Sequence, residues 1–149
     1  DGDDNYLTRV QAELASKSDL ASYMEGLAQD DRATLDRALR QEELIGRNDT
    51  AVLNSNINAI NVVQNRIQRE QESIEAEYAL RIQLVGDDTE KAIKLEKEKQ
   101  REIALKITPD LDMIDRLEAI VEEAQKSINT QRERLTTVSE TEDTIRYGS

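Results

Sequence analysis

Acidic side chains are the most abundant groups in this sequence that could take part in chemistry, because the chain contains neither histidine nor cysteine. The lack of these two residue types removes the commonest general base, the thiolate nucleophile and most zinc or di-iron sites. Paired carboxylates such as Glu122 and Glu123 lie in a stretch with the pattern of an exposed helix, where carboxylates are solvated rather than tuned for acid–base work. The sequence has no glycine-rich phosphate loop and no serine in a nucleophile-elbow pattern. We therefore expect no catalytic residues, no cofactor and no enzymatic activity.

The N-terminal stretch DGDDN carries acidic or amide side chains at the first, third and fifth positions of a calcium-binding loop. Such a loop requires glycine at its sixth position and glutamate at its twelfth, where this sequence has Tyr6 and Ala12. A flexible acidic terminus that ends in a helix cap accounts for the stretch better than a metal site does. We therefore predict that the chain binds no metal.

The net charge of −12 is spread along the chain and limits the class of partner. Direct binding to nucleic acid requires a basic stripe, and anionic membrane surfaces attract basic segments. No apolar run approaches the roughly 18 residues that a membrane span needs. We therefore expect a protein partner, no direct nucleic-acid binding and no membrane insertion. The sequence indicates no cellular compartment, and its first residue, Asp1, suggests a mature product, an excised domain or a trimmed form.

Long helices are the structure that the composition indicates. Aromatic residues make up only 3% of the chain, so Leu, Ile, Val and Ala must supply the core. Capping residues and apolar periodicity predict an all-α protein with one helical domain over residues 1–149. Its parts are short N-terminal helices within 5–45 (near 5–16, 19–28 and 32–45) and a hairpin over 50–146, with long helices at about 50–85 and 88–146.

The turn of this hairpin is indicated by Gly86, which suits the left-handed position after a helix end. Asp87 with Glu90 then resembles a capping box for the second long helix. Pro109 fits either the first position of a helix or a kink, because proline has no backbone N–H. We therefore predict an antiparallel hairpin that turns at residues 86–88, with a kink or break at Pro109.

Heptad spacing of apolar residues predicts a coiled-coil seam between the two long helices. On the first helix its two series are Leu53, Ile60, Ile67 and Ile74, and Ile57, Gln64, Gln71 and Tyr78. On the second helix they are Ile114, Val121, Ile128 and Leu135, and Leu117, Ala124, Gln131, Val138 and Ile145. With the turn near residue 87, antiparallel pairing places Ile60 near Ile114 and Ile67 near Ile107.

The stretch NSNINAINVVQN at residues 54–65 is rich in asparagine, which is a poor helix former because its amide competes for nearby backbone groups. Asn56 belongs to a second apolar line, which indicates contact with more than one helix and contains Ile45, Val52, Ala59 and Val63. We expect a three-helix or thicker bundle near residues 45–63, a two-stranded arm toward Gly86, and Asn56 as a semi-buried residue that fixes register. The other four asparagines form one stripe beside the seam: Asn54, Asn58, Asn61 and Asn65. A solvated face is the plainer interpretation of this stripe, and hydrogen bonding to a partner chain is the alternative.

The second long helix outruns the first, and its overhang at about 125–145 still carries one apolar line: Ile128, Leu135, Val138 and Ile145. Either the helices within residues 5–45 or another subunit must cover this line. We favour a shared cover, and therefore a homo-oligomer, because the N-terminal helices already serve the second line at 45–63.

Three functions are compatible with these features. The favoured one is a non-enzymatic structural or assembly protein, a helical coiled-coil subunit that mediates protein–protein interaction in a scaffolding, tail, fibre or secretion-machine type of complex. The second is a helical-bundle binding or sensor domain of a larger extracytoplasmic protein, although the sequence lacks the aromatic lining of a small-ligand pocket. The third is an acidic inhibitor that mimics nucleic acid.

Overall fold

The computed structural model describes residues 19–147, with side chains described to residue 141, and contains no strand in that part of the chain. Residues 19–25 are helical, and the predicted helix near 5–16 lies outside the described residues. The later elements are α2 (Gln29–Arg40), the short 3-10 helix η1 (Gln41–Leu44), α3 (Asp49–Val85) and α4 (Thr89–Tyr147). The predicted all-α fold is therefore confirmed.

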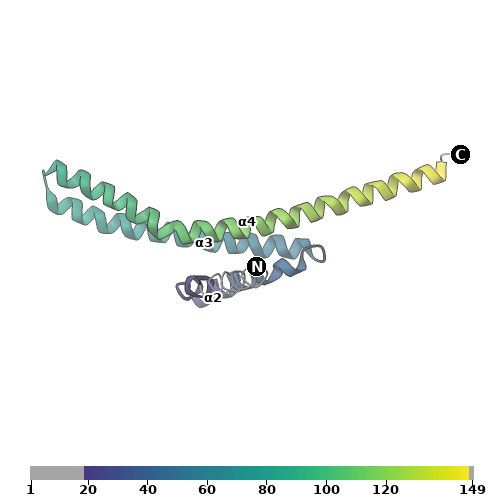
Figure 1. Ribbon diagram of the computed structural model, residues 1–149, viewed down its shortest axis with the longest axis horizontal. Helices are drawn as coiled ribbons and strands as arrows, with labels where there is room; N and C mark the ends of the chain where they lie inside the picture. The colour runs from purple at the N-terminus through teal and green to yellow at the C-terminus, as the bar shows by residue number, and fades with distance from the viewer. Residues whose placement is uncertain (1–18, 148–149) are drawn as a thin grey trace, which may run out of the picture.

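The hairpin of α3 and α4 is antiparallel, and Figure 1 shows the two helices side by side up to their turn. Gly86 ends α3 with a φ of 60°, a backbone conformation that favours glycine, as the sequence predicts. The cap of α4 differs from the prediction. Asp88, rather than Asp87, accepts a hydrogen bond from the backbone N–H of Lys91 at 3.2 Å, because α4 begins one residue later than expected.

The N-terminal end of α3 is fixed by a tight loop after η1. Asn48 occupies the cap position of this helix and accepts a hydrogen bond from Ala51 N at 3.3 Å. Asp49 is buried and accepts a bond of 2.7 Å from Gly46 N, so it closes the loop. This loop reverses the chain and lays α2 against α3.

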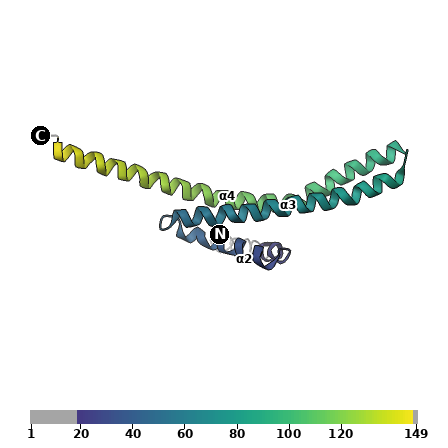
Figure 2. The same cartoon turned by 180° about the vertical axis from the view of Figure 1, so that it is seen from behind.

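Pro109 lies inside α4, which continues without a break from Thr89 to Tyr147. The prediction of a helix break is therefore wrong, while the alternative of a bend agrees with the bowed α4 in Figures 1 and 2. Proline removes one backbone hydrogen bond and crowds the preceding turn, which bends a helix without necessarily ending it. The exposed position of Pro109 lets α4 bend while keeping its opposite side packed.

The core of the bundle lies between α2, α3 and α4. From α2 it receives the buried side chains Leu35 and Ala38. Those of α3 in this region are Val52, Asn56, Ala59 and Val63, and those of α4 are Asp110, Met113, Leu117, Ile120 and Ala124. The predicted three-helix region is therefore confirmed.

The most buried line of α3 is the second apolar line of the sequence rather than the seam. Leu53 and Ile60 are only half-buried, and Ile57 is 48% exposed. Because α2 and α4 both pack on α3, the most buried line lies between those two contacts and not on the face that a two-helix seam would use. Part of the predicted seam is consequently left at the surface.

The arm between the bundle and the turn has only two helices and a thin core. Ile74, Tyr78 and Ile103 are its buried side chains, with Leu95 and Ile107 packed against them. Leu80 and Leu84 are exposed because no third helix reaches this part of the hairpin. The arm therefore matches the predicted two-stranded region.

Candidate interaction surface

The C-terminal segment of α4, residues 129–147, extends beyond the beginning of α3 and has no neighbouring helix in the described chain (Figure 1). Its described side chains, residues 129–141, are all exposed. The exposed fractions are 70% for Leu135 and 55% for Val138. The side chain of Ile145, which belongs to the same predicted line, lies outside the described residues. The helices within residues 19–45 therefore do not cover this apolar line.

Ile128 marks the point where α4 leaves the bundle. Its side chain is half-buried and lines a hollow of about 430 Å³ beside the loop at residues 47–50. Gln131 donates a hydrogen bond of 3.5 Å to the carbonyl of Gly46. The loop before α3 thus lies beside the first part of the overhang. Leu135 also lines this hollow, whereas Val138 lies beyond it.

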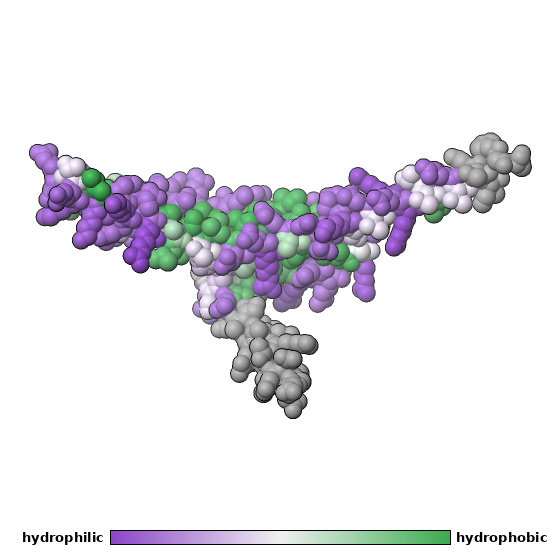
Figure 3. Space-filling view, turned by 45° about the horizontal axis from the view of Figure 1, so that its top comes forward, coloured by the Kyte–Doolittle hydropathy of each residue, from purple (hydrophilic) through white to green (hydrophobic). Residues whose placement is uncertain are grey.

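A second apolar surface lies on the hairpin where α2 does not cover it. We call it the open face and define it by Leu53, Ile57 and Ile60 of α3 and Leu111, Ile114 and Val121 of α4. Ile57 is 48% exposed, Leu111 is 47% exposed, and the other four are half-buried. Figure 3 shows hydrophobic side chains gathered along the middle of the molecule between two more polar ends. Except for Leu111, the residues of the open face belong to the predicted seam, and the three-helix packing leaves them uncovered.

The asparagine stripe is at the surface, since Asn54, Asn58, Asn61 and Asn65 are all exposed. None of the four side chains forms a hydrogen bond within the described residues. Asn58 and Asn61 line a hollow of about 270 Å³ with Thr34 and Arg37 of α2, so this part of the stripe borders the α2–α3 contact. Exposure without partners is what a solvated polar face would show.

Asn56 is fully buried, where the sequence suggests only partial burial. Its amide nitrogen donates to the backbone carbonyls of Ala38 at 3.3 Å and Val52 at 2.9 Å, while its Oδ1 atom has no partner. The bond to Ala38 joins α3 to the last turn of α2. Asn56 therefore links two helices of one chain rather than two chains.

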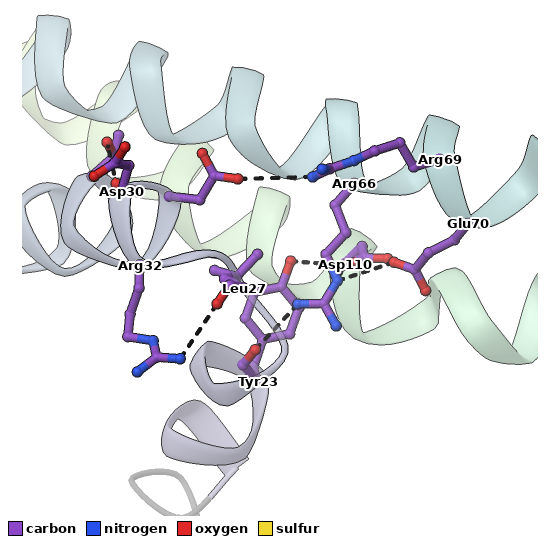
Figure 4. Close-up of polar contacts among 10 residues, drawn as sticks. Tyr23, Leu27, Asp30, Arg32, Arg66, Arg69, Glu70 and Asp110 are labelled. Carbon is purple, nitrogen blue, oxygen red and sulfur yellow. Dashed lines mark hydrogen bonds and ion pairs between the residues drawn. The ribbon is translucent and has the colours of Figure 1, made fainter.

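A buried polar cluster, consisting of Tyr23, Arg66, Glu70 and Asp110, was not expected from the sequence (Figure 4). The hydroxyl of Tyr23 donates to Asp110 Oδ1 at 2.7 Å, and Arg66 Nε lies 3.5 Å from the same oxygen and 3.1 Å from Glu70 Oε1. Arg66 also donates to the carbonyl of Tyr23 at 3.1 Å and lies 4.5 Å from the centre of its ring. The cluster thus joins the stretch at 19–25, α3 and α4.

The electrostatics of this cluster are set by two carboxylates that share one guanidinium. Burial, and then the neighbouring Asp110 carboxylate, raise the pKa of Glu70, and Arg66 only partly opposes that shift. Burial and the hydrogen bond to Asp110 also raise the pKa of Tyr23. Asp110 is 1% exposed, and its Oδ2 atom has no hydrogen-bond partner. These contacts hold the stretch at 19–25, α3 and α4 together. Within the described residues, no group of acidic side chains could hold a metal ion.

One signal in the sequence could have located this cluster. Asp110 falls on the seam series that continues as Leu117 and Ala124, so a carboxylate occupies a position where the pattern requires an apolar side chain. A charge at such a position needs a partner, and Arg66 lies close to its antiparallel counterpart on α3.

Comparison with other proteins gives no relative: the chain matches no protein-family model, no curated protein and no solved structure. Among the described residues, no helix is both long and apolar enough to cross a membrane.

Proposed function

We propose that this protein is a non-enzymatic structural subunit that assembles into a larger complex through the C-terminal segment of α4. The observation that carries the proposal is the exposure of Leu135 and Val138, at 70% and 55%, on a segment of α4 with no neighbouring helix in the described chain. The polar cluster supports the non-enzymatic part of the proposal, because one oxygen of each carboxylate is engaged by Tyr23 or Arg66 in contacts that join helices.

The energetic argument starts from the length of the two helices. α4 has 59 residues and α3 has 37, so at about 1.5 Å per residue α4 is longer by roughly 33 Å. Most of the stability of a helix in a protein comes from packing of its apolar face, and an unsupported helix is marginal in water. Burying a side chain such as Leu135 or Val138 contributes about 1.5–3 kcal/mol. A protein partner would therefore both stabilise this segment and remove its apolar line from water.

A second copy of the chain is the partner we favour. Each copy presents the same apolar line, and a symmetric pair covers two such lines at once. Flanking charges of both signs, Arg132, Glu133 and Arg134, would orient the association without preventing it.

The test combines Leu135→Glu with Val138→Glu and uses sedimentation to measure the oligomeric state. We expect the wild-type protein to be an oligomer and the double variant to dissociate into smaller species that keep their helical circular dichroism. Thr136→Glu combined with Thr137→Glu is the matched control, because it adds the same charge at neighbouring positions off the apolar line. This control should remain assembled.

Two outcomes would contradict the proposal. In the first, the wild-type protein is monomeric and unfolds when Leu135 and Val138 are replaced by glutamate. The C-terminal segment of α4 would then be part of an internal core. A double variant that stays assembled like the control would mean that the complex forms through another surface.

A further inference from the structure

The α4 side of the open face and the C-terminal segment share one continuous stripe of α4. Along this stripe, alternate steps of four and three residues give Ile107, Leu111, Ile114, Glu118, Val121, Gln125, Ile128, Arg132 and Leu135. The first part lies beside α3, where Leu111 is 47% exposed, and the last part lies beyond α3, where Leu135 is 70% exposed. The stripe therefore runs from the open face, which no helix covers, to the C-terminal segment of α4, which packs on no other helix.

We propose that the occupant of the open face is the C-terminal segment of a second copy, which packs antiparallel to α4 with Gln125 near the centre of the pair. This inference rests on the proposed function and specifies where and in which direction the second copy binds. In this arrangement each copy supplies the helix that the other lacks, so both apolar surfaces are covered by one symmetric contact.

The register of the pair follows from the stripe. An antiparallel pair centred next to Gln125 brings Ile114 of one copy level with Leu135 of the other, and Val121 level with Ile128. Leu111 is then level with Val138 of the second copy, which lies beside the stripe three positions after Leu135. The half-buried Ile60 and the exposed Ile57 of α3 flank these layers. Three apolar layers on each side of the centre thus coincide, as ridges into grooves require.

The charges along α4 favour this direction over a parallel one. Residues 115–123 carry mostly acidic side chains, namely Asp115, Glu118, Glu122 and Glu123 against Arg116. Residues 126–134 carry mostly basic ones, namely Lys126, Arg132 and Arg134 against Glu133. Antiparallel pairing sets the acidic stretch of each copy against the basic stretch of the other, whereas parallel pairing in register would set like charges together.

One pair of charges lies on the stripe itself. In this register Glu118 of each copy is level with Gln131 of the other, so Arg132, one position further along, lies next to Glu118. Both side chains are exposed, and neither forms an ion pair within the described residues. Charges that flank an apolar seam in this way set the orientation of paired helices.

The first experiment compares Leu111→Glu with Leu105→Glu by sedimentation. Both leucines are exposed on α4, at 47% and 68%, but Leu105 is off the stripe, so the two variants add the same charge six positions apart. We expect the wild-type protein to be a dimer, the Leu111→Glu variant to be a monomer and the Leu105→Glu variant to remain a dimer. A dimer that tolerates Leu111→Glu but is dissociated by the double change at Leu135 and Val138 would overturn the inference and leave the proposed function standing.

The second experiment reverses the charges on the stripe. Glu118→Arg and Arg132→Glu should each weaken dimerisation about tenfold, because each creates two like-charge contacts per dimer. Combining both reversals should restore the wild-type dissociation constant, and Glu98→Arg, at an exposed position in the arm away from the pair, should leave it unchanged. These differences should disappear in about 1 M salt. Single reversals without effect would exclude the antiparallel register, and a monomeric wild-type protein would overturn both the register and the proposed self-assembly.

Discussion

Tyr23 and Asp110 are 87 positions apart in the sequence and are joined by a hydrogen bond of 2.7 Å in the interior of the bundle. This bond ties the helical stretch at 19–25 to the middle of α4, next to Pro109. Arg66 contacts both residues from α3. Three segments that are distant in sequence therefore meet at one buried carboxylate, and this contact fixes how the N-terminal region sits on the hairpin.

The first prediction concerns this bond. Tyr23→Phe removes the hydroxyl that donates to the buried Asp110, and a hydrogen bond to a charged group contributes about 1.5–3 kcal/mol, so we expect the free energy of unfolding to fall by about that amount. Urea denaturation measures it. Tyr78→Phe is the matched control, since that hydroxyl donates to Glu102 at 2.6 Å and Glu102 is exposed to water. If both variants lost the same free energy of unfolding, the burial of Asp110 would not strengthen its hydrogen bond with Tyr23.

The second prediction concerns Asn56. Asn56→Ala removes its hydrogen bonds to Ala38 and Val52 and leaves a small void, so the free energy of unfolding should fall by about 1–2 kcal/mol. Asn54→Ala, two positions away and exposed, should instead raise it by a few tenths of a kcal/mol through helix propensity. Chemical denaturation of both variants gives the comparison. The oligomeric state should not change, because Asn56 links helices of one chain. If Asn56→Ala instead raised the free energy of unfolding, the cost of burying the unpartnered Oδ1 atom of Asn56 would exceed the gain from its two hydrogen bonds.

The third prediction is a pH dependence from Glu70, whose carboxyl pKa is raised in the folded protein by burial and by Asp110. The folded state then binds this proton more tightly than the unfolded chain, so the contribution of Glu70 to stability is fully present below the pKa of the unfolded chain and is lost as pH rises through the folded pKa. Glu70→Gln keeps an acceptor for Arg66 and removes this titration. We expect the variant to be more stable than wild type at pH 7, with the difference shrinking toward pH 4. Urea denaturation across this range measures it. Greater wild-type stability at pH 7 would mean that the ion pair with Arg66 outweighs burial.

The fourth prediction concerns the bend of α4. Pro109→Ala restores a backbone hydrogen bond at an exposed helical position, and the free energy of unfolding should rise by about 1–3 kcal/mol. Spin labels on the two halves of α4 should also report a longer separation, because the helix straightens. Asp112→Ala is the control for helix propensity alone and should raise stability by roughly 0.5 kcal/mol. If straightening separates Asp110 from Tyr23, stability will fall instead, and the bend will then be a requirement of the polar cluster.

Local chemistry in the sequence was sufficient to predict the two long helices and their turn, whereas the predicted helix at 32–45 is found as α2 and the 3-10 helix η1. Gly86 has the positive φ that its position after an apolar helix suggests, and the absence of strands among the described residues follows from unbroken helical periodicity. The exposed overhang also follows from helix lengths, since α4 must outrun α3 once the turn is placed. These features depend on residues close together in the chain, which is why a linear pattern contains them.

Which helix faces are buried was decided only by the tertiary structure. Heptad spacing placed Ile57 in the seam, yet it is 48% exposed, while Asn56 beside it is fully buried. A one-residue step rotates a side chain by about 100° around a helix, so the position of α2 determines which of two neighbouring apolar lines becomes the core. The same packing brings Tyr23 to Asp110 and leaves the open face uncovered. The sequence contains both apolar lines of α3, and only the docking of a third helix distinguishes the core from the surface.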